Sequence, residues 1–304
     1  MGAMRVTSQL LIDRALRNIN FQSRQIMALQ EQLATGRRVN RPSDDPINAR
    51  RAVNVRALIE KNDQYVANIS FISSPVAETY TSLETVLGYF NRGWELTVQG
   101  ANGTNAQSQL DTIALEVNQI IEGIFSTANH ESNGRYVFGG TRTGAPPYEA
   151  VRDANGEITA VNYVGNAEAV QVAISDILNL TYNEPGSGVF SASQDIFETL
   201  IDVRDNLRAG DTAALSSVRL PEMETVREQL LSAMARVGSI QNRLERSTEE
   251  FEDFNLQLSI QLSDTVDADF AEVIMRLNAQ DNAFQAALSA AARAIQPSLL
   301  QFLQ

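Results

Sequence analysis

Residues 12–36 read IDRALRNINFQSRQIMALQEQLATG, and a large aliphatic side chain returns at every seventh position of this stretch. These positions are Ile12, Ile19, Ile26 and Leu33. A seven-residue apolar repeat predicts a helix with a coiled-coil-like seam. Ser23 and Gln30 fall where a second apolar row is expected, so an ordinary amphipathic helix packed on a core fits the spacing equally well. Gly36 suits the position just after a helix, which places this helix at about residues 5–35.

A turn with two prolines follows, and it reads RRVNRPSDDP over residues 37–46. Asp45 can cap the next helix, with Pro46 at the first helical position, where its missing N–H has no cost. We expect helix from near Ile47 to about Val98, with or without an interruption. A further helix is predicted at about 106–129, whose buried side carries Leu110, Ile113, Val117, Ile120, Ile121 and Ile124.

The pattern changes at about residue 133, where short aromatic and β-branched runs alternate with turns. Residues 158–164 and 169–174 are predicted as strands flanking an Asn155-Gly156 turn. We therefore expect a small β domain over 133–185.

Helical patterns return from about Gln194. Leu207-Arg208-Ala209-Gly210 is predicted to end one helix, and Asp211 to cap the next. A long helix is predicted at 221–262 and a last one at 264–296. The last helix carries an apolar stripe with spacings of three, four and seven, formed by Ile274, Leu277, Phe284, Leu288, Ala291 and Ile295.

The predicted fold class is mainly α with a small β insert. We expect a long antiparallel helical rod in which coiled-coil-like N- and C-terminal helices pack together, with a central exposed β domain, because a short insert cannot hold such long helices alone. The expected segments are a cloning remnant at 1–3, an N-terminal assembly helix at 4–40, a rod at 41–132, the β domain at 133–185, the second half of the rod at 186–262 and a C-terminal assembly helix at 263–304.

Composition excludes several classes of function. The formal net charge of −13 argues against a general nucleic-acid binder. Residues 1–60 hold ten arginines against five acidic residues, a balance of +5, so the remainder carries −18. The chain has no cysteine, which excludes disulfides and thiolate metal sites, and it has no apolar stretch of about 18 residues that would predict a membrane span. A secretory signal peptide is not expected at its start.

The residue types that carry chemistry are sparse and scattered. His130, the single histidine, lies beside Asn129 and Glu131 in a helix-ending turn, where solvation is the expected state. Asp264, Asp267 and Asp269 do not form a calcium loop and are expected to cap the last helix. We predict no enzyme activity, no cofactor and no metal.

Two motifs and the C-terminal stretch carry a family resemblance. Asn40 to Ala49, NRPSDDPINA, resembles the loop after the first helix in the flagellin superfamily, and its Pro-Ser-Asp-Asp-Pro form is more similar to the hook-associated protein 3 family than to flagellin. Asn133 to Gly140, NGRYVFGG, is similar to the start of the β domain in that family. The C-terminal stretch from Leu277 to Leu303 resembles the last helix of flagellin-like proteins, so the resemblance spans essentially the whole chain.

The resemblance implies a structural subunit of the bacterial flagellum at the hook–filament junction. It implies copies of the chain assembled in a ring or short helical stack between hook-associated protein 1 and flagellin. It further implies an extracellular location, reached through the flagellar type III export apparatus with a cytoplasmic chaperone bound to the C-terminal part. The alternatives are flagellin itself and, from another class, an intracellular coiled-coil scaffold.

Charge adds one more hypothesis about assembly. Residues 245–272 hold nine carboxylates, and arginines stand at 37, 38, 41, 50, 51 and 56, among which Arg50 and Arg51 lie near the start of the helix after the proline turn. Arginine can hold carboxylates bidentately, so these two residues are candidates for ion pairs between subunits, although a solvated face is the simpler interpretation.

Overall fold

The computed structural model describes the chain from residue 2 to residue 300, and it divides into two compact units. The terminal unit comprises residues 1–61 together with 253–304, and the middle unit comprises residues 62–252. The boundaries fall inside two long helices.

The described part of the chain is predominantly helical, as predicted. The helices are α1 (Gly2–Thr35), α2 (Pro46–Gly100), α3 (Gln107–Ala128), α4 (Gly186–Phe190), α5 (Ile196–Ala209), α6 (Thr212–Ala214), a π-helical turn (Leu215–Arg219), α7 (Leu220–Val266) and α8 (Phe270–Leu300). Helix α2 continues through Pro75 without a break, and α7 ends later than the predicted residue 262. Of the described helices, none offers a segment long and apolar enough to cross a bilayer.

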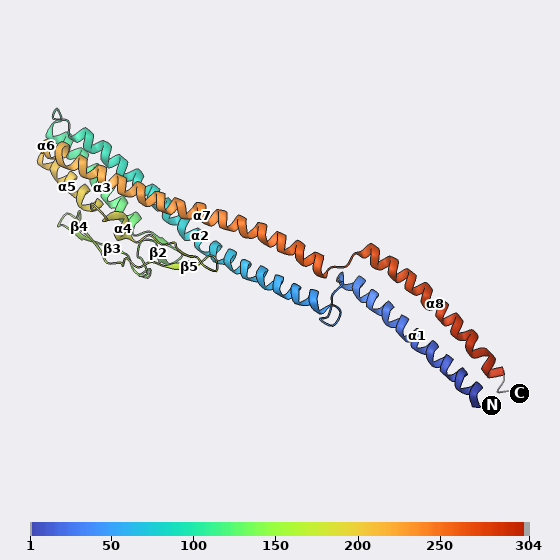
Figure 1. Ribbon diagram of the computed structural model, residues 1–304. Helices are drawn as coiled ribbons and strands as arrows, with labels where there is room; N and C mark the ends of the chain where they lie inside the picture. Colours follow the sequence, from blue (N-terminus) through green and yellow to red (C-terminus); the bar gives the residue numbers. More distant parts are fainter. Residues whose placement is uncertain (1, 301–304) are drawn as a thin grey trace. The chain divides into compact units, whose positions relative to one another are not determined.

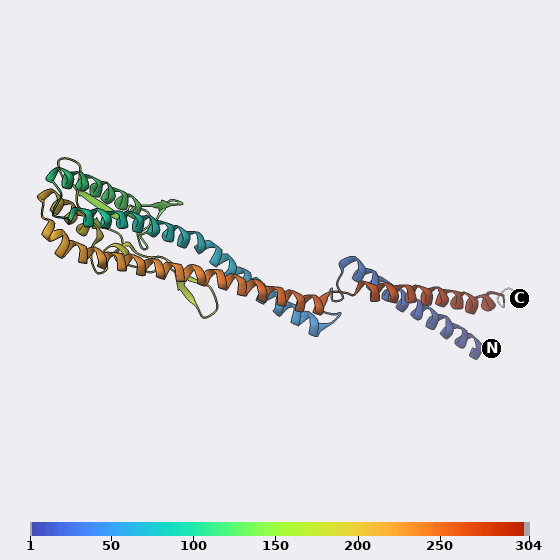
Figure 2. The same ribbon diagram turned by 90° about the horizontal axis from the view of Figure 1, so that it is seen from above.

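In the terminal unit, α1 and α8 lie side by side and run antiparallel, so their free ends lie together (Figures 1 and 2). Gly36 ends α1 with φ +70°, the left-handed conformation that glycine adopts without strain, as the sequence predicted. The turn after α1 pairs with the turn before α8, because the Arg38 N–H donates to the Val266 carbonyl at 2.7 Å and the Ala268 N–H to the Gly36 carbonyl at 2.9 Å.

The turn with two prolines is ordered by its own aspartates. Asp44 Oδ2 accepts from the Arg41 N–H at 2.8 Å, and Asp45 Oδ1 accepts from the Asn48 N–H at 3.0 Å. The second bond is the predicted cap of α2. It also lowers the pKa of the Asp45 carboxyl. Val39 of this turn packs with Ala52 of α2 and Val266 of α7 in a small buried cluster.

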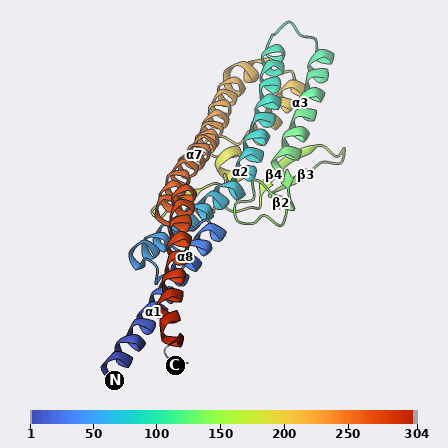
Figure 3. The same cartoon turned by 90° about the vertical axis from the view of Figure 1, so that its right-hand side faces the viewer.

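The middle unit is built on the parts of α2 and α7 that belong to it, packed with α3 and α5 around one apolar core. Figure 3 shows α2, α3 and α7 side by side. All six apolar residues predicted on the buried side of α3 are buried. Gly210 ends α5 with φ +70°, and the Asp211 side chain accepts from the Ala214 N–H, so both predicted helix signals are confirmed.

The β insert consists of three separate antiparallel strand pairs. They are β1 (Glu131–Ser132) with β2 (Arg135–Tyr136), β3 (Tyr148–Arg152) with β4 (Ile158–Tyr163), and β5 (Gln171–Ala173) with β6 (Asn179–Thr181). Residues 158–163 form a strand beside the Asn155-Gly156 turn, as predicted, but its partner across the turn is not the predicted strand at 169–174. That turn joins β4 to β3, which the sequence analysis missed, whereas residues 171–173 pair with β6.

A buried arginine fixes the β3–β4 hairpin to the helices. Arg204 of α5 is almost fully buried, and its Nη1 donates to Asn118 Oδ1 at 3.0 Å and to the Ile158 carbonyl at 2.8 Å. At the surface, Arg208 forms two hydrogen bonds of 2.6 and 2.7 Å with the Glu157 carboxylate. These bonds hold the start of β4 on α5, so this hairpin is a rigid part of the middle unit.

Candidate assembly interface

Helices α1 and α8 meet along a seam with heptad spacing. On α1 the partly buried positions include a row that alternates by four and three residues, formed by Ala15, Ile19, Gln22, Ile26, Leu29 and Leu33. Ser23 and Gln32, each next to a member of this row, are partly buried as well. On α8 the corresponding positions are Val273, Leu277, Gln280, Phe284, Ala287 and Ala291. This spacing is that of a coiled coil, so Ile19, Ile26 and Leu33 agree with the first interpretation of the repeat, whereas the side chain of Ile12 lies outside the described residues. The second row of α1 contains Gln22 and Leu29, whereas Gln30, which the sequence analysis placed there, is exposed.

A polar pair lies inside this seam. The side-chain amide of Gln280 donates to the side-chain oxygen of Gln22, and both side chains are partly buried. A hydrogen-bonded polar pair at a seam position favours the one helix register in which both partners are satisfied. The apolar positions of the seam hold α1 and α8 together, and the glutamine pair sets the register in which they align.

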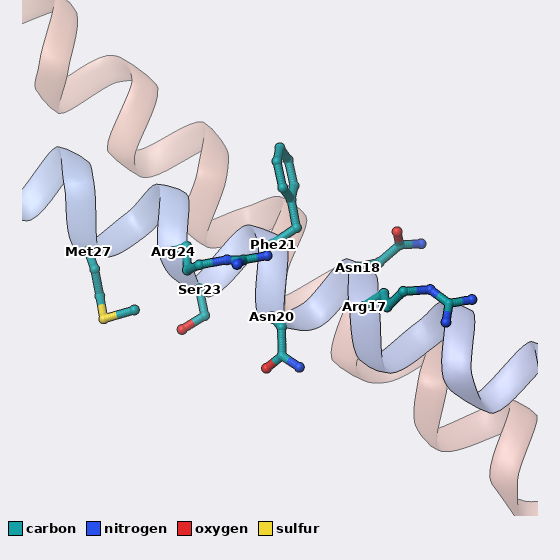
Figure 4. Close-up of a pocket in the computed structure, with 7 residues that line it drawn as sticks. All are labelled: Arg17, Asn18, Asn20, Phe21, Ser23, Arg24 and Met27. Atoms are coloured by element: carbon teal, nitrogen blue, oxygen red, sulfur yellow. The ribbon is translucent and has the colours of Figure 1, made fainter. Parts of the chain in front are cut away.

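The outer face of α1 is not covered in the single chain. Figure 4 shows Arg17, Phe21, Arg24 and Met27 on successive turns, beside a shallow depression. Phe21 is 53% exposed and Met27 is 56% exposed, and on α8 Met275 is 66% exposed. A two-helix unit with large apolar side chains on its outer faces presents a surface suited to protein contacts.

The predicted interface residues fall on both faces. Ile19, Ile26 and Leu33 of α1 lie in the seam opposite α8. Leu277 and Phe284 lie in the seam from the α8 side, whereas Ile274 and Leu288 are nearly half exposed on its outer face. The backbones of Ile12 and Ile295 are helical, and their side chains lie outside the described residues. The C-terminal residues 301–304 also lie outside them.

Arg50 and Arg51 are exposed on the first turns of α2. Among the ion pairs of the described residues, neither arginine takes part. Both guanidinium groups therefore face solvent in the single chain.

Charge differs sharply between the two units. The terminal unit holds 13 basic and 11 acidic residues, a formal charge of +2, whereas the middle unit holds 11 basic and 26 acidic residues, a charge of −15. Like charges on neighbouring copies repel. Contacts between copies through the terminal unit therefore carry less electrostatic repulsion than contacts through the strongly acidic middle unit.

The other candidate residues have structural partners. His130 Nε2 lies 3.5 Å from the Glu78 carboxylate at the surface. Asp269 caps α8 by accepting from the Ala271 N–H at 2.8 Å, but Asp264 lies within α7, and Asp267 accepts from the Ser263 hydroxyl, so only one of the three aspartates acts as predicted. Within the described part of the chain no group of acidic and histidine side chains could hold a metal ion.

The fold defines a class of protein, the mainly helical chains whose paired N- and C-terminal helices carry exposed apolar side chains on their outer faces. A family model of the bacterial flagellin N-terminal helical region matches residues 6–143, and a model of the flagellin C-terminal helical region matches residues 220–303. The chain belongs to the flagellin superfamily, which confirms the family indicated by the two sequence motifs.

Relatives within the superfamily differ in how much of the chain they match. Flagellar hook-associated protein 3 of Escherichia coli is 26% identical over 94% of this chain and 96% of its own length. Flagellin of Clostridium tyrobutyricum is also 26% identical, but over 65% of this chain and 54% of its own length. The hook-associated relative therefore matches the middle of the chain as well as the ends.

A solved structure supports the fold. The flagellar junction protein FlgL from Legionella pneumophila aligns with a TM-score of 0.61 at 14% identity, and the alignment covers 72% of this chain and all of that chain. The predicted fold class, mainly helical with a small β insert, is confirmed.

Proposed function

We propose that this chain is the structural subunit that joins the flagellar hook to the filament. The observation that carries the proposal is the uncovered apolar outer face of α1 and α8, in a chain that matches a hook-associated protein over 94% of its length. Copies of the chain form a ring or short helical stack, with hook-associated protein 1 on one side and flagellin on the other. The protein acts by packing and carries no enzymatic activity.

The proposed mechanism couples the ordering of the terminal helices to assembly. Two helices with a single mutual seam leave most of their surface in water, and helices owe most of their stability to tertiary packing. We expect α1 and α8 to exchange their amide hydrogens quickly in the dilute monomer and slowly in the assembled junction, as in coupled folding and binding. Hydrogen exchange followed by mass spectrometry measures this difference. Strong protection of both helices in the monomer would contradict the mechanism.

Export belongs to the same proposal. The subunit leaves the cell through the flagellar type III apparatus, and a cytoplasmic chaperone binds its C-terminal part beforehand. A chaperone that covers the exposed apolar side chains of α8, such as Met275, prevents premature association. The final location is extracellular, at the junction.

The test of the proposed function is deletion of this chain from a motile strain. We expect hooks that lack filaments and flagellin released into the medium, with both defects reversed when the chain is supplied again. Normal filaments in the deletion strain would remove the junction role and favour an intracellular scaffold. Growth of long filaments from the purified chain alone would favour flagellin.

A further inference from the structure

The middle unit contains an apolar groove between α2 and the β insert. Its volume is about 650 Å³, and its apolar lining comprises Phe71, Pro75, Tyr136, Val137, Val170 and Tyr182. Phe71 is 64% exposed although it lies directly at the groove. Exposed aromatic side chains around a concave apolar surface are typical of the centre of a protein–protein contact.

One charged residue at the groove stands out. Arg135 of β2 is exposed, and its guanidinium forms no hydrogen bond or ion pair with any residue that the structure describes. Glu78, the acidic residue at the groove, lies 3.5 Å from His130. In a unit with a formal charge of −15, an arginine without a partner favours an acidic ligand at this point.

The turn between β5 and β6 carries an apolar and an acidic side chain, which complement the apolar lining and the arginine of the groove. This hairpin tip, residues 175–178, carries Asp176 followed by Ile177, whose side chain is 96% exposed. Turns normally select small or polar residues, so a β-branched apolar residue at this place has no local explanation. The tip therefore offers an apolar side chain and a carboxylate at adjacent positions.

The tip is fixed to α2 by two hydrogen bonds. The Tyr65 hydroxyl donates to Asp176 Oδ1 at 2.5 Å, and the Asn68 side-chain amide donates to the Ala173 carbonyl at 2.9 Å. Both donors belong to α2, so the hairpin lies along this helix and presents Ile177 in a fixed position. A fixed tip binds at a smaller entropic cost than a mobile one.

We propose that the β5–β6 tip of one copy inserts into the groove of the next copy. Ile177 packs against Phe71 and Tyr136, and the carboxylate of Asp176 comes close to Arg135. The tip and the groove are different surfaces of one chain, so the contact is heterologous and passes from copy to copy. Such a contact generates a ring or a stack, and the inference therefore rests on the proposed junction function.

A single inserted isoleucine makes a weak contact, and this suits a subunit that must stay unassembled before export. The contact gains strength in the junction, because packing of the terminal helices keeps neighbouring tips and grooves at a high effective concentration. The tip and groove then set the spacing of the middle units, whose negative charges repel one another.

Disulfide cross-linking tests this contact, because the natural chain contains no cysteine. Ile177→Cys and Phe71→Cys are made in separate chains, both at exposed positions, and the two chains are supplied together to the deletion strain. Val151→Cys, at another exposed apolar position of the insert, replaces Ile177→Cys in the matched control. Junctions in sheared hook–filament preparations are then treated with a mild oxidant.

We expect the Ile177→Cys and Phe71→Cys pair to give at least about tenfold more cross-linked dimer than the control pair, because contacting residues have a high effective concentration. Adding Arg135→Glu to the Phe71→Cys chain lowers this yield, whereas Arg142→Glu, which changes the charge of the same insert equally, does not. A yield no higher than that of the control pair overturns the proposal.

The outcome is separable from that of the proposed function. Filaments restored by the cysteine chains show that the variants fold and that the junction forms. With filaments restored and no specific cross-link, the junction function stands and the tip–groove contact is wrong. Normal filaments in the deletion strain would overturn the junction function instead.

Discussion

Gln280 of α8 donates its side-chain amide to the side-chain oxygen of Gln22 of α1, in the middle of the seam between the two helices. Ile19 lies three residues before Gln22 and Ile26 four residues after it, and Leu277 and Phe284 flank Gln280 in the same way. A polar pair among apolar seam residues specifies the register of the two helices but lowers the stability of their association.

Replacing both glutamines by leucine, Gln22→Leu with Gln280→Leu, should strengthen the association of α1 and α8, because two apolar side chains then meet in the seam. Gln22→Leu alone should weaken it by about 1 kcal/mol, because Gln280 then lacks a partner. Helix content by circular dichroism during thermal unfolding measures both effects. Gln25→Leu, at an exposed position of α1, is the control and should change little. Equal behaviour of the single and double variants would refute a paired role.

Reversing the charges of Arg50 and Arg51, by Arg50→Glu with Arg51→Glu, should weaken assembly and leave the monomer folded. Both side chains are exposed and take part in no ion pair among the described residues, so the fold does not depend on them. The number of subunits retained on isolated hooks, with the thermal unfolding curve of the monomer, separates the two effects. Unchanged assembly would show that these arginines merely cover a solvated face.

Arg204→Met should destabilise the middle unit by about 2–4 kcal/mol, because it leaves the buried Asn118 side chain and Ile158 carbonyl without their donor. Arg208→Met removes a pair at the surface and should cost about 1 kcal/mol or less. Urea unfolding measures both changes. Similar costs for the two variants would mean that burial of Arg204 contributes little.

Acid should destabilise the protein through three carboxylates. The backbone N–H of Asn48 lowers the pKa of Asp45, the backbone N–H of Glu157 lowers that of Asp153, and the Arg208 guanidinium lowers that of Glu157. A lowered folded-state pKa gives stability that is present above the unfolded-state pKa and is lost as the pH falls through the folded-state value. The loss should therefore develop below about pH 4.5, the ordinary value for glutamate.

Urea midpoints measured from pH 6 downward test this expectation, with Glu157→Gln as the informative variant. Its stability should fall less steeply in acid, because one of the three carboxylates no longer binds a proton on unfolding. An identical pH dependence in the variant and the natural chain would exclude a contribution from Glu157.

Some features followed directly from the amino-acid sequence. Gly36 and Gly210 ended their helices and Asp45 and Asp211 capped theirs, because each signal acts within a few residues of the backbone that it satisfies. The buried side of α3 was also predictable, since its apolar residues repeat with the period of a helix. The two sequence motifs identified the family.

The tertiary structure decided which of two neighbouring apolar residues faces inward. Val273 and Ala287 lie in the seam, whereas the larger Ile274 and Leu288 lie outside it. Periodicity gives an apolar stripe, but adjacent residues point about 100° apart on a helix, and only the partner helix selects between them. The pairing of β3 with β4, the burial of Arg204 and the bond between Gln22 and Gln280 likewise join residues far apart in the chain. Local signals cannot specify such pairs, because each partner is satisfied only after the whole fold has brought the other to it.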